Sequence, residues 1–265
     1  MTFFESLANR INSIGSILCI GLDPDIAYIP SHLQDEDLPI WSFNRRIIDA
    51  TCSYAAAYKP NAAYYENSDG WDSLVETISY AHGKGVPVIL DAKRADIGAT
   101  AHQYAKLLDM ADAITANPYM GIDSLSPFLS RSDAGVFILC RTSNPGGSDL
   151  QNLKLSSGMY LYEHVALLAD SWNEHGNVGL VVGATNPDEL QRVRTLTPDL
   201  PFLVPGIGAQ KGNVESAANH CLSSHNVGLV SASRSIIFAG EGDTFDKSAG
   251  SAAKRARDLL NQSLK

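Results

Sequence analysis

The chain has 265 residues, a hydrophobic content of 45% and a formal net charge of −9 at pH 7. These values are typical of a folded protein with enough apolar residues for a large core, and the negative charge argues against nucleic acid or an anionic membrane as a general partner. No apolar run approaches the roughly 18 residues that a membrane span needs, and the N-terminal segment lacks the basic residues of a secretion signal. We therefore expect a cytoplasmic protein.

Short β-type runs alternate with amphipathic, helix-like segments along nearly the whole chain. The expected strands are Ser16–Leu22, Ala55–Lys59, Val86–Asp91, Ala111–Thr115, Gly135–Cys140, Val178–Val182, Phe202–Pro205 and Val227–Ser231. The expected helices are Trp41–Tyr54, Gly70–His82, Gly98–Met110, Gly158–His175, Asn186–Leu196 and Lys247–Leu264.

Eight strands, each followed by a helix or a helix-sized segment, predict one (β/α)8 barrel domain over residues 1–265, since about 250 residues are typical of that fold. The alternative is an open, doubly wound sheet, which more often has a Gly-x-Gly-x-x-Gly turn after its first strand. The segment Gly21-Leu22-Asp23-Pro24-Asp25 is not such a turn. The longest irregular stretch, from Thr142 to Ser157, is expected to be a lid or a disordered loop.

Charged residues follow the first three predicted strands. Asp23 ends the first strand, Lys59 ends the second, and Asp91 and Lys93 end the third, with Asp96 just beyond. The functional groups of a (β/α)8 barrel lie at the carboxyl ends of its strands, and consecutive strands are neighbours. We therefore expect these acids and bases to meet as one charge array at the mouth of the barrel. The alternative is a set of solvated ion pairs at the strand ends.

Two further loops have residues suited to ligand binding. The glycine-rich turn Pro205-Gly206-Ile207-Gly208-Ala209-Gln210 follows the seventh strand, and Arg234 follows the eighth. Phosphate sites in such barrels are frequently built from these two loops, with backbone N–H groups and a guanidinium as donors, so we predict a phosphate site here. Ser143 and its neighbours after the fifth strand either read the hydrogen-bonding edge of a heterocycle or cap the loop.

No metal, disulfide or cofactor site is predicted. The four cysteines lie far apart without a Cys-x-x-Cys pair, and no histidine has a partner at the spacing of metal ligands.

These residues, in this order, resemble the orotidine 5′-phosphate decarboxylase family, and most of all its longer bacterial subtype (type 2). The specific element is Asp91-x-Lys93-x-x-Asp96-Ile97-x-x-Thr100, and the likeness extends from the first strand to the eighth. The resemblance implies a metal-free and cofactor-free lyase of pyrimidine biosynthesis. It would convert orotidine 5′-phosphate to uridine 5′-phosphate and carbon dioxide through a carbanion at C6, which Lys93 stabilises and protonates.

The resemblance also implies roles for the other motif residues. Lys59 and Asp23 would meet the ribose, and Asp91 and Asp96 would complete the charge array around Lys93. The remaining substrate contacts would be Ser143 to the pyrimidine, Pro205, and Gln210 and Arg234 to the phosphate. A homodimer is implied as well, in which Asp96, Ile97 and Thr100 enter the partner's site. The chain departs from the family at Lys211 and at Ala232-Ser233, where glycine is frequent.

Two other functions remain open from the residues. The first is a Mg²⁺-dependent sugar-phosphate lyase or aldolase, which would have a metal-binding acid near the end of the second strand. Lys59 stands there and would repel a divalent cation, while Glu66 comes several residues later. The second is a phosphosugar-binding barrel without turnover, which would keep Gln210 and Arg234 and would not need the charge array.

Overall fold

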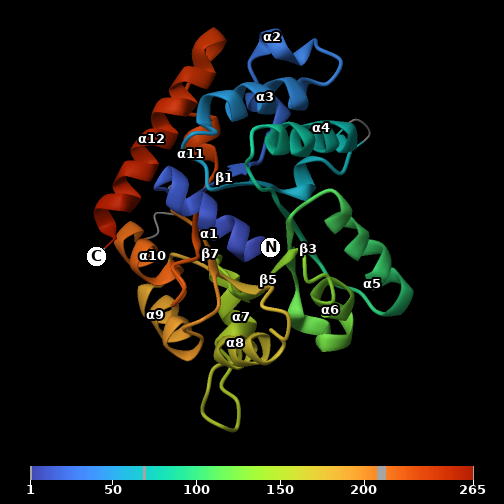
Figure 1. The fold of residues 1–265 in the computed structure, drawn as a ribbon, viewed down its shortest axis with the longest axis vertical. Coiled ribbons are helices and arrows are strands. Elements are labelled where there is room, and N and C mark those ends of the chain that lie inside the picture. The colour runs from blue at the N-terminus through green and yellow to red at the C-terminus, as the bar shows by residue number, and fades with distance from the viewer. Residues whose placement is uncertain (1, 68–69, 208–212, 265) are drawn as a thin grey trace.

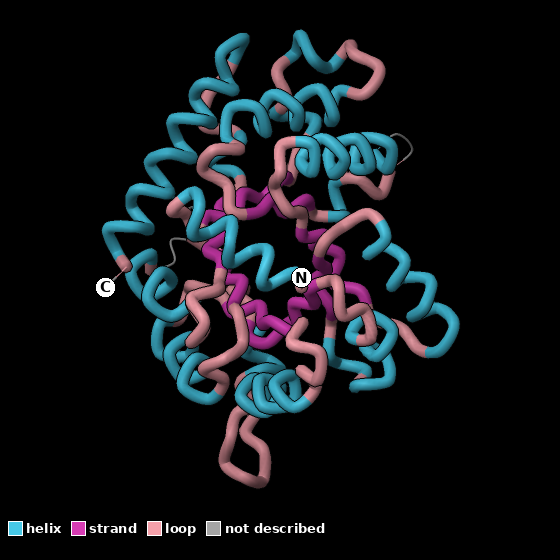
Figure 2. The backbone as a smooth tube through the Cα atoms, in the orientation of Figure 1, coloured by secondary structure: helices cyan, strands magenta, loops and turns pink. Residues whose placement is uncertain are grey.

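Eight parallel strands form a ring in the computed structural model, which describes residues 2–67, 70–207 and 213–264. Their order is β2-β1-β8-β7-β6-β5-β4-β3, and the bridges Tyr58↔Val88 and Asn61↔Asp91 join the two ends of this sheet. Figure 2 shows the ring of strands with helices around it. The predicted (β/α)8 barrel is confirmed. The strands are β1 Leu18–Leu22, β2 Ala57–Pro60, β3 Ile89–Arg94, β4 Ala113–Ala116, β5 Gly135–Arg141, β6 Val178–Val182, β7 Phe202–Pro205 and β8 Leu229–Ala232.

Most helices surround the ring on its outer side, whereas the first helix, α1 (Phe3–Ile14), lies across one end of the ring (Figure 1). The longer helices are α1 Phe3–Ile14, α3 Pro39–Thr51, α4 Gly70–Gly83, α5 Gly98–Ala105, α6 Ile122–Leu129, α8 Leu161–Ser171, α9 Pro187–Leu196, α10 Val214–Cys221 and α12 Phe245–Ser263. Single turns of α-helix are α2 Ser31–Gln34, α7 Ser148–Gln151 and α11 Arg234–Ile237. Short 3₁₀ turns are η1 Ile26–Tyr28, η2 Ala62–Tyr64, η3 Lys106–Asp109, η4 Pro118–Met120, η5 Pro145–Gly147 and η6 Gly242–Thr244. No helix in the described part of the chain is long and apolar enough to cross a lipid bilayer.

The strands lie where the apolar runs predicted them, although β1, β2, β3, β4 and β8 begin two or three residues later. Val86 shows why, because its side chain is buried although it precedes the first residue of β3. Apolar residues are therefore needed beyond the hydrogen-bonded ladder, and hydrophobicity by itself overestimates a strand's length.

Helix α1 was not predicted, and it packs against the start of β5. Phe3 and Phe4 make edge-to-face contacts with Phe137, and a Cβ at Gly135 would collide with the ring of Phe3. The helix begins with a capping box between Thr2 and Glu5, a sequence signal for a helix start. Because these contacts are at the amino-terminal end of the strands, the opposite end is left for the site.

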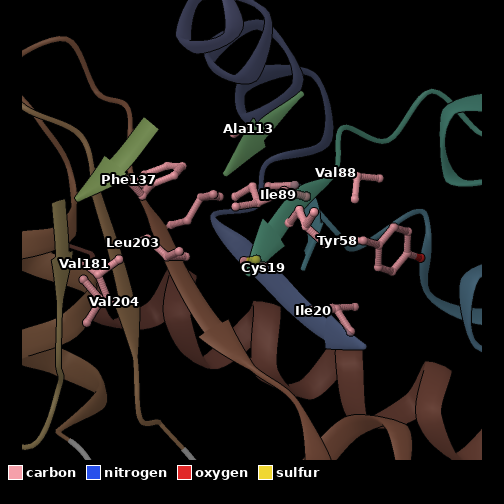
Figure 3. Packing of buried hydrophobic residues seen from close by; sticks show 14 of the residues in the cluster. Cys19, Ile20, Tyr58, Val88, Ile89, Ala113, Phe137, Val181, Leu203 and Val204 are labelled. Carbon is pink, nitrogen blue, oxygen red and sulfur yellow. The ribbon is translucent and has the colours of Figure 1, made fainter. Parts of the chain in front are cut away.

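Buried side chains fill both the barrel interior and the layer between strands and helices. Figure 3 shows the side chains of Phe137 and Ile89 among the strands, whereas the ring of Tyr58 points away from these two residues. The hydroxyl of Tyr58 lies 2.7 Å from Thr51 Oγ1 in α3, so its ring packs between β2 and that helix. Adjacent residues of a strand face opposite sides, and the neighbouring residue Lys59 consequently faces the interior.

Candidate active site

Three charged side chains from β2 and β3 form a continuous row at the carboxyl ends of the strands. Lys59 Nζ lies 2.7 Å from Asp91 Oδ2, and Lys93 Nζ lies 2.6 Å from Asp91 Oδ1. Each oxygen of the Asp91 carboxylate is thus paired with a different ammonium group. The charge array expected from the strand ends is present for these three residues.

Lys59 is the buried member of the row. Burial by itself would lower its pKa, but the negative charges of Asp91 and Asp23 outweigh burial and raise it. The ammonium group is therefore permanently charged and serves as a fixed counter-ion. The thiol of Cys19 lies in the same interior, where burial raises its pKa to about 12 and keeps it neutral.

Asp91 stays ionised although it is mostly buried. Burial would raise its pKa, but the charges of Lys59 and Lys93, together with their hydrogen bonds, hold it well below the usual range. A carboxylate with a cation on each side is a rigid element, because any rotation would break an ion pair. The row therefore presents Lys93 at a set position.

Lys93 combines an exposed side chain with an unusual backbone. Its φ is +51°, one of two positive values among the described residues other than glycine. The left-handed region is disfavoured for residues with a Cβ, and such strain clusters at functional sites. The ladder between β3 and β4 is also irregular at this point, between Leu90 and Arg94. A bulge of this kind re-aims a side chain beside an active site.

A small hollow of about 130 Å³ opens beside the row, between the ends of β1, β2, β7 and β8. Asp23 Oδ1 is buried there without a hydrogen-bond partner among the described residues, and a buried acceptor of this kind normally requires a partner. The other described lining residues are Lys59, Pro205, Gly206, Ile207, Ser231, Ser233, Arg234 and Ser235.

Arg234 reaches this hollow from the first position of α11. Its side chain is exposed, and in the described part of the chain its guanidinium has no hydrogen bond or ion pair. The structure therefore brings Asp23, Lys59, Pro205 and Arg234 together as predicted. Gln210 and Lys211 lie outside the described residues.

Asp96 and Ile97 directly precede α5, and Thr100 lies in its first turn. Asp96 accepts a hydrogen bond from the backbone N–H of Ile97 at 2.8 Å, and it forms no ion pair with a described residue. Ile97 and Thr100 are exposed, Ile97 by 59%. Within the single chain, Lys93 has its hydrogen bonds and ion pair with Thr115 and Asp91 and none with these three described residues.

Ser143 lies in the loop after β5 and borders a separate hollow of about 530 Å³, together with Arg141, Asn144, Pro145, Thr185 and Asn186. The loop is anchored by a nearly buried ion pair between Arg141 Nε and Glu189 Oε2 at 2.6 Å. Gln151 Oε1 also accepts a hydrogen bond from the backbone N–H of Thr142 at 2.9 Å. The stretch predicted as a lid or a disordered loop contains η5 and α7, and its residue Lys154 forms an antiparallel bridge with Tyr160 just beyond it.

A mostly apolar hollow near this end of the barrel lies apart from the row. It measures about 510 Å³ and has Leu139, Tyr162, Leu168 and Trp172 among its lining residues. We place the candidate site at the smaller hollow, because only that one contains Asp23, Lys59 and Arg234. No group of three or more metal-binding side chains is found within residues 2–67, 70–207 and 213–264.

The sequence interpretation assigned no ligand contact to several polar residues at the site, among them Ser231, Ser233 and Thr115. Ser231 and Ser233 line the small hollow, and Thr115 donates a hydrogen bond to Asp91 Oδ1. The two serines stand at the end of β8, and the alternation of side chains along a strand was a signal for their position. Thr115 gave no chemical signal, because threonine is common in strands.

Comparisons with known proteins assign this arrangement to a family. Residues 16–244 match the family described as "Orotidine 5'-phosphate decarboxylase / HUMPS family". The orotidine 5′-phosphate decarboxylase of Haloarcula marismortui is 61% identical over 276 residues, which cover 99% of each chain. The protein of the same name from Azoarcus sp. is 49% identical over 268 residues, which cover 98% of this chain and 99% of the relative.

The same likeness holds between structures. The structure of Leishmania donovani OMP decarboxylase has a TM-score of 0.85 and 42% sequence identity, with 99% of each chain covered. The bacterial subtype that the sequence suggested is not confirmed, because the relative at 61% identity is archaeal.

Proposed function

The chain belongs to the orotidine 5′-phosphate decarboxylase / HUMPS family, and we propose that it decarboxylates orotidine 5′-phosphate without a metal ion, with Lys93 as the proton donor. It is an enzyme of the decarboxylase type, with a place in pyrimidine biosynthesis. The observation that carries the proposed mechanism is the row Lys59–Asp91–Lys93, whose outer ammonium group is the accessible one. The products are uridine 5′-phosphate and carbon dioxide.

The reaction requires a cation close to C6 of the pyrimidine. When the C6 carboxylate leaves as carbon dioxide, the electron pair of the broken bond stays on C6, in the plane of the ring and outside the π system. Lys93 Nζ stabilises this charge and then transfers a proton to C6, which gives the product. Stabilisation of charge that develops only in the transition state is usually the largest single contribution to an enzymatic rate.

Lys59 and Asp91, the two mostly buried residues of the row, determine where the ammonium group of Lys93 lies. Asp91 Oδ1 holds Lys93 Nζ at 2.6 Å, and Lys59 holds the other oxygen of the same carboxylate. We assign Lys59 and Asp23 to the ribose, because Asp23 Oδ1 is a buried acceptor that needs a donor. Two lysines at this point disfavour a divalent cation, which supports the metal-free mechanism over a Mg²⁺-dependent lyase.

The phosphate binds at the other side of the small hollow. Arg234 supplies the guanidinium, and Gln210 is assigned to the same group from the sequence motif. Binding energy from this remote phosphate holds the pyrimidine against the charge row, a common way to lower a barrier at a distant atom. We assign Ser143, at the end of β5, to the pyrimidine edge.

The complete site is shared between two copies of the chain. Asp96, Ile97 and Thr100 enter the site of the partner, where Asp96 adds a second carboxylate next to Lys93. Two observations support this: Asp96 lacks an ion pair with the described residues, and Ile97 is an exposed apolar side chain beside it. The working unit is a homodimer of single-domain chains spanning residues 1–265, and the cytoplasm is its proposed location.

The test is the ultraviolet absorbance of orotidine 5′-phosphate mixed with the purified protein and a chelator. Loss of the orotate absorbance in the presence of the chelator is expected for the wild type, whereas Lys93→Ala should still bind uridine 5′-phosphate without turnover. Turnover that needs added Mg²⁺ would overturn the metal-free mechanism, and substantial turnover by Lys93→Ala would remove Lys93 as the proton donor. Nucleotide binding without turnover by the wild type would indicate a binding barrel.

A further inference from the structure

The strand that carries Lys93 loses its ladder contact with β4 just before the site. Leu90 pairs with Ile114 and Arg94 pairs with Ala116, so residues 91–93 of β3 lie opposite the single residue Thr115 of β4. The peptide groups of this stretch cannot all find partners in the backbone of β4. The N–H of Lys93 finds its acceptor in a side chain instead, at 2.9 Å from Thr115 Oγ1.

The same hydroxyl also binds the charge row. Thr115 Oγ1 donates a hydrogen bond to Asp91 Oδ1 at 2.9 Å, and that oxygen in turn accepts from Lys93 Nζ at 2.6 Å. The contacts form a closed ring that runs from the Lys93 N–H through Thr115 and Asp91 to the Lys93 ammonium group. Lys93 is thus held at both ends of its side chain, and hydrogen bonds in such a chain strengthen one another.

We propose that Thr115 is a positioning residue of this enzyme, whose hydroxyl holds Lys93 in its left-handed conformation and orients the carboxylate of Asp91 toward the ammonium group. The inference rests on the proposed role of Lys93. Thr115 is only 1% exposed and lies behind Asp91, so it acts through these two residues. Without its acceptor, the strained backbone of Lys93 (φ +51°) relaxes and the ammonium group moves away from C6.

Three variants separate this role from a general packing role. Thr115→Val removes the hydroxyl and keeps the branched shape, and Thr115→Ser keeps the hydroxyl. Thr197→Val is the matched control, because Thr197 is also a fully buried threonine whose hydroxyl hydrogen-bonds a backbone carbonyl, that of Val193 in α9. The measurements are kcat and KM, the number of uridine 5′-phosphate sites by calorimetry, and hydrogen exchange of the Lys93 amide by NMR.

We expect Thr115→Val to lower kcat about 100-fold per nucleotide site, a loss typical of a reacting group displaced by about 1 Å. KM and the number of nucleotide sites should change little, and the Lys93 amide should exchange at least about tenfold faster. Thr115→Ser should restore most of kcat, and Thr197→Val should leave kcat per site unchanged.

Several results would overturn the inference. A kcat of Thr115→Val within about twofold of the wild type, or a loss in proportion to the number of folded sites, would mean that Thr115 only fills space. An unchanged exchange rate of the Lys93 amide would mean that the hydroxyl does not hold the backbone. Failure of the wild type to act on orotidine 5′-phosphate would instead contradict the proposed function, and the exchange rate still decides whether Thr115 holds Lys93.

Discussion

Lys59 Nζ lies 2.7 Å from Asp91 Oδ2, and only 8% and 12% of the two side chains are exposed, whereas Lys93 on the other oxygen of Asp91 is 48% exposed. The two lysines therefore differ in solvent exposure although both are paired with the carboxylate of Asp91. Lys59 is a mostly buried counter-ion that borders the small hollow, and Lys93 is the more exposed ammonium group. The division of roles between them follows from this difference in burial.

Replacement of Lys59 by methionine should destabilise the protein markedly. The substitution replaces the ammonium group by an unbranched apolar side chain one atom shorter and leaves Asp91 nearly buried with one of its two cations missing. Removal of one partner from a buried pair typically costs about 3–5 kcal/mol of the free energy of unfolding. Urea denaturation at pH 7 measures this change.

The control is Lys84→Met, since Lys84 pairs with Asp49 at the surface and should leave the urea midpoint nearly unchanged. If both substitutions shift the midpoint equally, the ion pair of Lys59 is not the stabilising feature. Turnover should also be lost in Lys59→Met, because Asp91 no longer has a fixed orientation.

Replacement of Arg234 by alanine should selectively impair turnover of the phosphorylated substrate. The guanidinium is exposed and without a partner among the described residues, so folding should be unaffected. Loss of its hydrogen bonds to a phosphate should lower kcat/KM for orotidine 5′-phosphate about 100-fold, equivalent to about 2.7 kcal/mol. Steady-state kinetics with orotidine, which lacks the phosphate, provides the comparison.

Arg234→Ala and the wild type should act equally, and slowly, on orotidine. A wild-type kcat/KM of the variant for the phosphorylated substrate would rule out a phosphate contact. An equal decrease with both substrates would place Arg234 in a structural role.

Two inactive variants should restore activity when they are mixed. Lys93→Ala lacks the proposed proton donor of its own site, and Asp96→Asn lacks the carboxylate that we propose it contributes to the partner's site. In a mixed dimer one site then has both groups. Equal amounts, allowed to exchange subunits, should recover about a quarter of wild-type turnover, because half of the dimers are mixed and each has one complete site.

The matched control for the mixing experiment is Lys93→Ala with Asp91→Asn. Each change lies in the site of the chain that carries it, so both sites of the mixed dimer are incomplete and no activity should return. Equal recovery in the two mixtures, or none with Asp96→Asn, contradicts a shared site.

The pair of His82 and Asp112 should make stability depend on pH far from the site. His82 Nε2 lies 2.7 Å from Asp112 Oδ2, and this hydrogen bond raises the pKa of His82 above 6.5, against the opposing effect of burial. A raised pKa in the folded state contributes stability that is fully present below the unfolded pKa of about 6.5 and is lost as pH rises through the folded pKa. The contribution should be under about 1 kcal/mol, because both side chains are partly exposed.

Urea denaturation of His82→Gln and the wild type at pH 5.5 and pH 9 measures this contribution. The wild type should exceed His82→Gln in free energy of unfolding, and this difference should be larger at pH 5.5 than at pH 9. His175→Gln is the control, since His175 is exposed and has no acidic partner in the described part of the chain. If the difference in free energy of unfolding between the two proteins grows as pH rises, the result contradicts this mechanism.

Hydrophobic patterning predicted the order and type of the eight strands, because burial in the barrel requires apolar runs at regular intervals. Helix α1 was not predicted although its capping box at Thr2 and Glu5 was visible. Its apolar face includes Phe3 and Phe4, which need Phe137 of β5 as a partner, and that contact joins residues more than 130 positions apart. The hydrophobic residues of a short helix do not indicate, from sequence alone, which distant strand they will pack against.

The sequence by itself determined which charged residues stand at the strand ends: the order of Asp23, Lys59, Asp91 and Lys93 depends only on side-chain type and strand periodicity. The tertiary structure decided how each of them is buried and paired. The exposure of Lys93 and the burial of Lys59 follow from the packing of neighbouring strands, and the left-handed backbone of Lys93 occurs where its N–H bonds the side chain of Thr115 on β4. Burial, strain and hydrogen-bond geometry arise between segments distant in sequence, so only the folded chain defines them.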